Sequence, residues 1–116
     1  MENFEVVRED RTEVSILRLR GFLDAHTAPQ FEKAIQELLS EDKFQIIVSM
    51  ADLNYISSAG LGVFMGFIEE IREKEGDIKL SNMSDKVFKV FDLLGFPALY
   101  QIYKDESEAE DKYNQG

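Results

Sequence analysis

Hydrophobic and polar residues follow two different periods along this chain, and each period predicts a different kind of element. After Thr27, apolar residues recur at the i, i+3, i+4, i+7 and i+8 spacing of a helix lying on a sheet: Phe31, Ala34, Ile35, Leu38 and Leu39. Residues 44–50 instead form a nearly continuous, β-branched apolar run. This run is too short for a helix and favours a central strand covered on both faces.

The same patterns predict the other elements. Four further strands are expected, over residues 4–7, 14–20, 78–80 and 99–103. The polar residues 8–12 indicate a turn, and Gly21 is expected to end the strand before it. One helix is expected to run from the serines at 57 and 58 to Gly76, and another from Ser84 to Gly95.

This order of elements defines the fold class. Strands and helices that alternate over short connections imply an α/β domain. We expect a mixed, largely parallel β-sheet with three or four helices, mainly on one face. Thr27 is the expected N-cap of the first helix, with Pro29 in its first turn and Gln30 at the reciprocal capping-box position.

Length and composition indicate one domain with an acidic end. The 116 residues fit a single domain over 1–104, followed over 105–116 by an acidic C-terminal tail or frayed helix. Residues 105–111 hold five acidic side chains, which favours a solvated tail.

Charge and cysteine content exclude several classes of function. Lys plus Arg is 13 and Asp plus Glu is 23, so the net charge is 13 − 23 = −10. Such a chain repels nucleic acid and anionic membranes, and it suits a protein partner with a basic surface. Arg18 and Arg20 are assigned to a solvated strand face. With no cysteine, no apolar run of about 18 residues and no signal-peptide pattern at its start, the chain is expected to be cytoplasmic.

Two kinds of catalytic or cofactor site are disfavoured at Ser57 and Ser58. A nucleophile elbow requires glycine where Ile56 stands, and the only histidine, His26, lies upstream of the serines. The spacing Gly-x-Gly-x-x-x-Gly over 60–66 is one residue longer than a dinucleotide fingerprint, and no acidic residue ends the following strand. We therefore expect no enzyme activity, no cofactor and no metal site.

A covalent phosphate on a serine fits this position better. A helix N-terminus offers unpaired N–H groups and the positive end of the helix dipole, so it stabilises a phosphate. The simpler alternative, that the serines only cap the helix, stays open. For the glycines, Gly66 is expected to pack closely on the sheet, whereas Gly60 and Gly62 allow close approach by a partner.

Two segments resemble a known family. Residues 52–63, Asp-Leu-Asn-Tyr-Ile-Ser-Ser-Ala-Gly-Leu-Gly-Val, are similar to the signature of the STAS-domain anti-sigma factor antagonists of bacteria. Residues 21–28, Gly-Phe-Leu-Asp-Ala-His-Thr-Ala, resemble that family's segment before its first helix. Ser57 stands where many members have Asp, and Ala59 where Ser or Thr is common. The similarity in element order covers nearly the whole chain.

The resemblance implies a partner-switching protein. The unmodified protein would bind an anti-sigma factor that is also a serine kinase and so release the sigma factor. Phosphorylation would end this binding, and a serine phosphatase would restore it. The modified residue would be Ser58, with Ser57 as second choice, on a monomer or weak dimer. The partner-binding residues would be Asp24, His26, Ser57, Ser58, Ala59, Gly60, Leu61 and Gly62.

A different role for the same fold is also open. The chain could be a non-switching STAS interaction module of a transporter, a lipid-trafficking complex or a signalling complex. The identity of the protein that co-purifies with it would separate the two roles.

Overall fold

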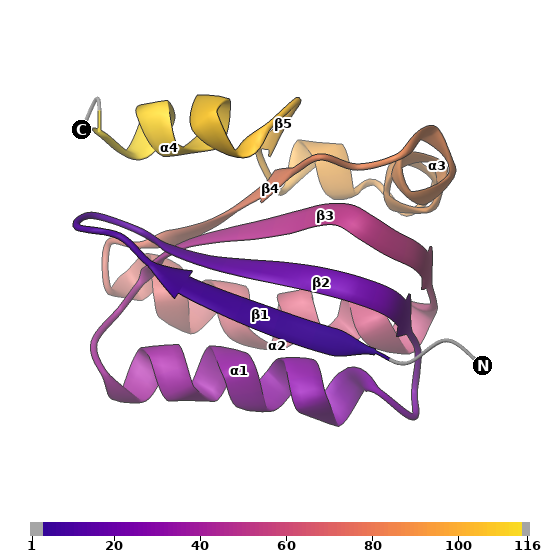
Figure 1. Ribbon diagram of the computed structural model, residues 1–116, viewed down its shortest axis with the longest axis horizontal. Coiled ribbons are helices and arrows are strands. Elements are labelled where there is room, and N and C mark those ends of the chain that lie inside the picture. Colours follow the sequence, from indigo (N-terminus) through magenta and orange to yellow (C-terminus); the bar gives the residue numbers. More distant parts are fainter. Residues whose placement is uncertain (1–3, 115–116) are drawn as a thin grey trace.

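Five strands and four α-helices follow one another in the computed structural model, which describes residues 4–114 (Figure 1). In chain order they are β1 (Glu5–Asp10), β2 (Ser15–Leu23), α1 (Ala28–Ser40), β3 (Gln45–Ile56), α2 (Ser58–Glu73), β4 (Asp77–Ser81), α3 (Asp85–Leu93), the short 3₁₀ helix η1 (Phe96–Ala98), β5 (Ile102–Tyr103) and α4 (Glu106–Asn114).

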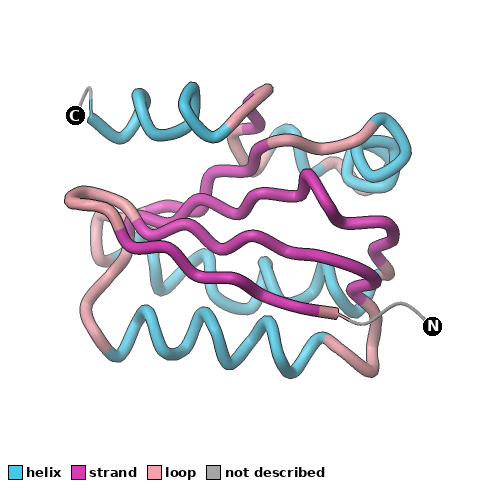
Figure 2. Tube along the Cα trace, viewed as in Figure 1, coloured by secondary structure: helices cyan, strands magenta, loops and turns pink. Residues whose placement is uncertain are grey.

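The strands form one mixed sheet in the order β1-β2-β3-β4-β5 (Figure 2). β1 pairs with β2 antiparallel, and the other three pairings are parallel. The predicted mixed, largely parallel sheet is thereby confirmed, with β3 at its centre and β1 at one edge. Parallel strands end at the same side of a sheet, so the segments after β2, β3 and β4 all leave from one end of the molecule.

α1 and α2 cover one face of the sheet (Figure 1). The predicted stripe of α1 faces this core, where Phe31, Ile35 and Leu38 are fully buried. α3 joins the same core, because the ring of Phe91 lies 5.8 Å from that of Phe64 on α2. The prediction that helices lie mainly on one face is therefore confirmed, with α4 as the helix on the opposite face.

Several predicted strand limits were wrong. β1 continues to Asp10, and the turn lies over 11–14, closed by a hydrogen bond from Arg11 N to Val14 O of 2.8 Å. β2 passes through Gly21, which has a φ of 95°, and ends at Leu23. β3 runs on to Ile56. The pairing of β2 with β3 shifts register twice, between Arg18 and Arg20 and between Gly21 and Phe22. At each shift β3 has one more residue than β2, which bends the strand.

The helix ends show which local signals were reliable. Ser84 caps α3 by accepting from Val87 N at 3.2 Å, and Gly95 follows α3 with a φ of 77°, as predicted. Gly76 does not provide the left-handed residue after α2. Glu75 does so with a φ of 63°, whereas a Cβ on Gly76 would lie 2.1 Å from the carbonyl oxygen of Phe44. Gly76 is therefore required by close packing.

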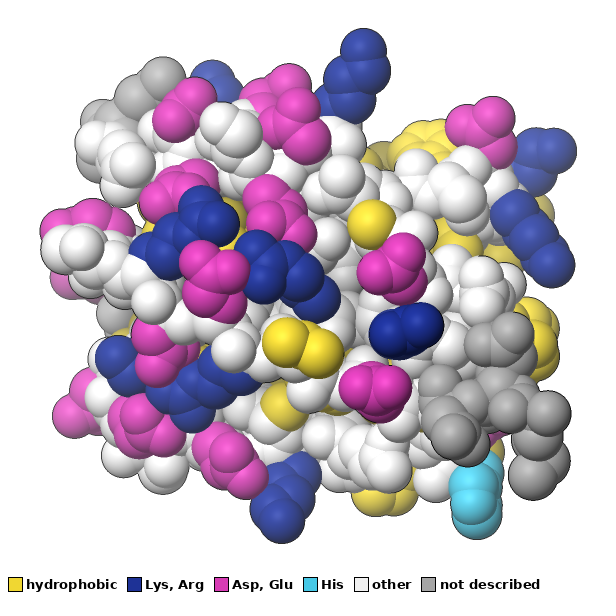
Figure 3. All heavy atoms as spheres, in the orientation of Figure 1, with side chains coloured by type: hydrophobic (Ala, Val, Ile, Leu, Met, Phe, Trp, Pro, Cys, Tyr) yellow, Lys and Arg dark blue, Asp and Glu magenta, His cyan; other side chains and the backbone are white. Residues whose placement is uncertain are grey.

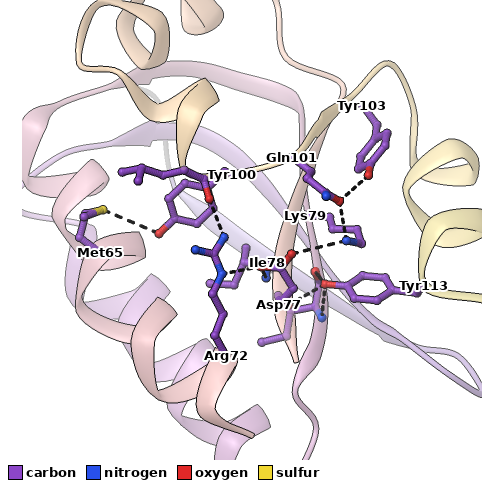
Figure 4. Close-up of polar contacts among 11 residues, drawn as sticks. Met65, Arg72, Asp77, Ile78, Lys79, Tyr100, Gln101, Tyr103 and Tyr113 are labelled. Atoms are coloured by element: carbon purple, nitrogen blue, oxygen red, sulfur yellow. Dashed lines mark hydrogen bonds and ion pairs between the residues drawn. The ribbon is translucent and has the colours of Figure 1, made fainter. Parts of the chain in front are cut away.

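The last predicted strand is shorter than expected. Of residues 99–103, only Ile102 and Tyr103 form a strand, although Gln101 O also accepts from Leu80 N of β4. Tyr100, just before them, is buried and packs its ring 6.0 Å from that of Phe64. Arg72 of α2 lies against the Tyr100 ring and donates to the carbonyl of Leu99, so this segment is fixed to α2 (Figure 4).

The expected solvated acidic tail is instead a helix on the sheet. Ala109 of α4 is fully buried against Val14, Ile16 and Ile47. The hydroxyl of Tyr113 lies between two strands, 2.7 Å from Ile46 O of β3 and 2.6 Å from Asp77 O of β4, so these two carbonyls share its single proton. Residues 115–116 lie outside the described residues. No helix within 4–114 is long and apolar enough to cross a bilayer.

Candidate functional site

Two serines stand at the junction of β3 and α2, and they have different environments. Ser57 is the N-cap of α2: its hydroxyl accepts from Gly60 N at 3.4 Å, and its own N–H donates to Leu23 O at 2.9 Å. Ser58 is the first helical residue and is exposed. Its hydroxyl makes no hydrogen bond to any residue within 4–114. Ser57 is thus used by the fold, and Ser58 is available to other molecules.

The start of α2 can bind a negative charge. Gly60 N is satisfied by the cap and Leu61 N donates to Ser57 O at 3.0 Å. The N–H groups of Ser58 and Ala59 have no acceptor among the described residues. Free N–H groups and the helix dipole both favour an anion at this position.

Gly60 lets α2 begin in direct contact with the end of β2. A Cβ at this position would lie 2.7 Å from Cγ of Leu23 and 3.1 Å from its carbonyl oxygen. Because Leu23 is fully buried, only a residue without a side chain fits here. The contact places the loop after Leu23 beside the start of α2.

That loop is held in shape by Asp24. Its Oδ1 accepts from His26 N at 2.9 Å and from Thr27 N at 3.1 Å. The Thr27 hydroxyl accepts from Asp24 N at 2.9 Å and donates to Phe22 O at 2.8 Å. Thr27 is therefore the N-cap residue of α1, as predicted, but its side chain closes the loop instead of capping the helix.

Comparison with known proteins places this geometry in a family. Residues 4–109 match the family described as the STAS domain. The chain belongs to the STAS domain family. A relative from Paenibacillus polymyxa, an anti-sigma F factor antagonist, is 32% identical over 111 residues, which cover 92% of this chain and 92% of the relative. The anti-sigma-B factor antagonist of Listeria monocytogenes is 26% identical over 106 residues, covering 91% and 92%.

Solved structures agree with this assignment. The anti-sigma factor antagonist SpoIIAA in its unphosphorylated form is 28% identical and superposes with a TM-score of 0.82, covering 98% of each chain. The phosphorylated form of SpoIIAA from Bacillus has a TM-score of 0.73, covering 93% of this chain and 98% of its own. The chain therefore falls among the anti-sigma factor antagonists, which are regulatory binding proteins and not enzymes.

The STAS domain brings most of the predicted contact residues to one end of the sheet. His26, Ser58, Ala59 and Gly62 are exposed there, and Asp24 and Ser57 are half-buried. Two predicted contacts do not reach the surface. Leu61 is 2% exposed and packs in the core, and Gly60 is buried against Leu23. We therefore do not retain Leu61 and Gly60 as contact residues.

The expectation for Gly66 was also wrong. A Cβ on Gly66 would meet nothing within 4 Å, and the same holds for Gly62. Both residues face outwards and line a shallow groove of about 240 Å³ beside α1, together with Glu32, Ala59, Val63 and Phe67. The helical phase set by Phe64 and Ile68 could have shown that Gly60 faces the sheet and that Gly62 and Gly66 do not.

Sequence reasoning missed two aromatic residues at this end of the sheet. Phe22 and Tyr55 pair across β2 and β3 with ring centroids 5.6 Å apart, and they are 39% and 43% exposed. Exposed aromatic pairs are enriched in protein–protein interfaces. Their position directly before the buried residues Leu23 and Ile56 was the available signal, because neighbouring strand residues point to opposite faces.

Charged side chains are paired mainly at the other end of the molecule. Figure 3 shows Lys and Arg side chains interspersed with Asp and Glu over the hairpin of β1 and β2. There Arg8 bonds to Asp10 and Glu41, each at 2.8 Å, and lowers the pKa of both carboxyl groups. These ion pairs gather at the hairpin end, and none of the ion pairs within residues 4–114 involves Ser57 or Ser58.

Proposed function

We propose that this STAS domain protein is an anti-sigma factor antagonist that is switched by phosphorylation of Ser58. The unmodified protein binds an anti-sigma factor, and the phosphorylated protein does not. The observation that carries the proposal is the position of Ser58. Its hydroxyl is exposed at the first residue of α2 and has no partner among the described residues.

The fold can accommodate a phosphate at this position. The group would extend into solvent beside the free N–H groups of Ser58 and Ala59, which are hydrogen-bond donors suited to an anion. Phosphate on Ser57 would instead disturb the cap that this side chain provides for Gly60 N. That SpoIIAA has been solved in phosphorylated and unphosphorylated forms, both similar to this chain, supports the same conclusion.

The same phosphate would oppose a closely packed partner. It adds about 1.5 to 2 negative charges and substantial bulk. This change falls beside the end of β2, where Ser57 N donates to Leu23 O, and one helical turn from the exposed Gly62. A partner packed over Gly62 would have to move away, while the domain itself keeps its contacts.

The role requires two further proteins. We infer an anti-sigma factor with serine kinase activity, which both binds and modifies the antagonist, and a serine phosphatase that resets it. All three would act in the cytoplasm, with the antagonist as a monomer or weak dimer. The names of the relatives favour this role over a module of a transporter or lipid-trafficking complex.

Mass measurement of the modified chain tests the assignment. The chain is incubated with its anti-sigma factor and ATP, and its intact mass is recorded. We expect one added phosphate on the wild-type chain and on Ser57→Ala, and none on Ser58→Ala. An unchanged phosphate increment on Ser58→Ala, or none on the wild type, would contradict the proposal. Ser58→Asp is expected to weaken binding of the anti-sigma factor.

A further inference from the structure

The outer edge of β5 presents backbone groups without partners. Leu80 N donates to Gln101 O at 3.0 Å, and Asn82 N donates to Tyr103 O at 3.3 Å, so residues 101 and 103 direct peptide groups at β4. In a parallel pair the residue between them points its N–H and C=O the other way. Ile102 therefore turns both groups outwards, where no residue within 4–114 meets them.

A groove follows this edge. It has a volume of about 500 Å³ and is lined by Phe88, Pro97, Tyr100, Gln101, Ile102 and Tyr103. Tyr100 and Ile102 pack with the core on the α2 side. Gln101 and Tyr103 lie on the opposite face, where Gln101 accepts from Lys79 and from the Tyr103 hydroxyl at 2.7 and 2.6 Å (Figure 4). Because residues from both faces of the sheet line the groove, it must run along the outer edge of β5.

The groove is uncharged, although the chain is strongly acidic. None of its six lining residues is ionised at neutral pH, whereas 31% of the chain is charged. Phe88 adds an apolar wall and is 38% exposed. The charges on the remaining surface of α3 cancel, since two lysines lie between two aspartates: Asp85, Lys86, Lys89 and Asp92. An uncharged segment enters such a groove without desolvating an ion.

We propose that the outer edge of β5 binds an extended, uncharged apolar segment of a partner protein. The segment adds a sixth strand to the sheet, exchanges hydrogen bonds with the N–H and C=O of Ile102, and places an apolar side chain against Phe88. This site is separate from the Ser58 surface, because it lies at the sheet edge two strands away from β3.

A second copy of the chain fits this edge less well. β5 has two residues, so pairing of two such strands buries far less than the roughly 1,200 Å² of a stable interface. Two chains that each carry a net charge of −10 also repel one another. A narrow peptide avoids both costs and fills the groove.

Peptide selection tests the proposal. A phage library of seven-residue peptides is selected on the full chain and counter-selected on Ile102→Pro, which lacks the outward N–H but keeps the bonds that residues 101 and 103 make to β4. We expect uncharged, β-branched peptides that bind Ile102→Pro at least tenfold more weakly. In NMR titration they shift the amides of Ile102 and Phe88. Their binding is lost when the peptide is N-methylated at its pairing residue.

Three results would overturn the proposal. The first is that no peptide is enriched over the counter-selected library. The second is that the peptides bind Ile102→Pro as tightly as the wild type while the circular dichroism of the variant is unchanged. The third is that the NMR shifts caused by the peptides are centred away from β5. Ile102→Val, which keeps the N–H, should bind as the wild type does. If the wild type dimerises in sedimentation and Ile102→Pro does not, the edge belongs to a second copy. Ser58→Ala should retain peptide binding, which separates this test from that of the switch.

Discussion

Single glycines in α2 have opposite roles that depend on the face they occupy. Gly60 faces β2, and an added methyl group would meet the fully buried Leu23 at 2.7 Å. Gly62 lies half a turn further and faces open space. Glycine costs a helix about 1 kcal/mol relative to alanine, so its presence at an open position needs a reason outside the fold. Close approach of the proposed anti-sigma factor at Gly62 would supply one.

The two glycines are therefore expected to respond oppositely to alanine. Gly60→Ala should lower the free energy of unfolding by about 1 to 3 kcal/mol, because it overpacks against Leu23. Gly62→Ala should raise it by about 0.5 to 1 kcal/mol, because it removes a flexible residue from an exposed helix position. Urea unfolding of both variants measures the difference, and each serves as the control for the other.

Gly62→Ala also reports on the partner. If the anti-sigma factor packs on this helix face, the variant should be more stable than the wild type and yet bind the partner more weakly. Unchanged binding would place the partner elsewhere on the STAS domain. A loss of stability in Gly62→Ala would contradict the open environment of this residue.

Among the elements, α4 is held mainly by polar contacts. Its single buried apolar residue is Ala109. Arg18 of β2 binds Glu106 through two hydrogen bonds of 2.9 Å, and the ammonium of Lys79 lies 4.6 Å from the Tyr113 ring centroid. Contacts of this kind depend on pH and on single hydroxyl groups, which makes the docking of α4 testable.

Acid should weaken the docking of α4. Hydrogen bonds from Arg18 lower the pKa of Glu106 below 4.5. A carboxyl group whose pKa is lower in the folded state stabilises that state above its unfolded pKa, and the contribution is lost as the pH falls through the folded pKa. Amide exchange in α4 should therefore rise below about pH 4.5. In Arg18→Gln, the pKa of Glu106 measured by carbon NMR should return towards 4.5.

Arg8→Gln is the matched control for this measurement. Arg8 pairs with Asp10 and Glu41 and does not contact α4. Its loss should raise the pKa values of those two carboxyl groups and leave that of Glu106 unchanged. A Glu106 pKa that is unaffected by Arg18→Gln would show that this ion pair does not hold the helix in solution.

The hydroxyl group of Tyr113 should contribute much of the remaining stability of the contact between α4 and the sheet. The Tyr113 hydroxyl bonds to both the N–H and the C=O of Ile46 and to the C=O of Asp77. Tyr113→Phe removes the part-buried hydroxyl that joins α4 to β3 and β4, and the loss of its hydrogen bonds should cost about 0.5 to 1.5 kcal/mol of unfolding free energy in urea. Tyr103→Phe removes a more exposed hydroxyl that bonds only to Gln101, and it should cost less. Equal costs would contradict the special role of Tyr113.

The sequence predicted those elements whose buried residues recur at regular spacing or whose ends carry a local capping signal. The stripe of α1 and the cap and stop of α3, Ser84 and Gly95, are of this kind. It missed the docking of α4, because one alanine and one tyrosine make no stripe and the contacts to Arg18 and Ile46 span the chain. At the site, it placed Ser58 correctly at the helix start, but it could not show that Ser57 would be the residue used as the cap.

At the scale of the whole molecule, charge and the proposed switch should act on different steps of binding. The net charge of −10 attracts a basic surface over several ångströms, so the association rate with the anti-sigma factor should fall as salt is raised. Phosphorylation makes the chain more negative still. Long-range attraction to a basic partner is then undiminished, so under the proposed switch the loss of binding would arise from contacts at Ser58.

We therefore expect phosphorylation to act on dissociation. In surface plasmon resonance, the phosphorylated chain should associate at a similar or slightly higher rate and dissociate at least about tenfold faster, because the phosphate displaces packed contacts and leaves electrostatic encounter intact. Raising NaCl from about 50 to 500 mM should slow the association of both forms, because salt screens exposed charges. Slower association of the phosphorylated form, with an unchanged dissociation rate, would show that the switch works through charge repulsion at a distance and not through displaced contacts.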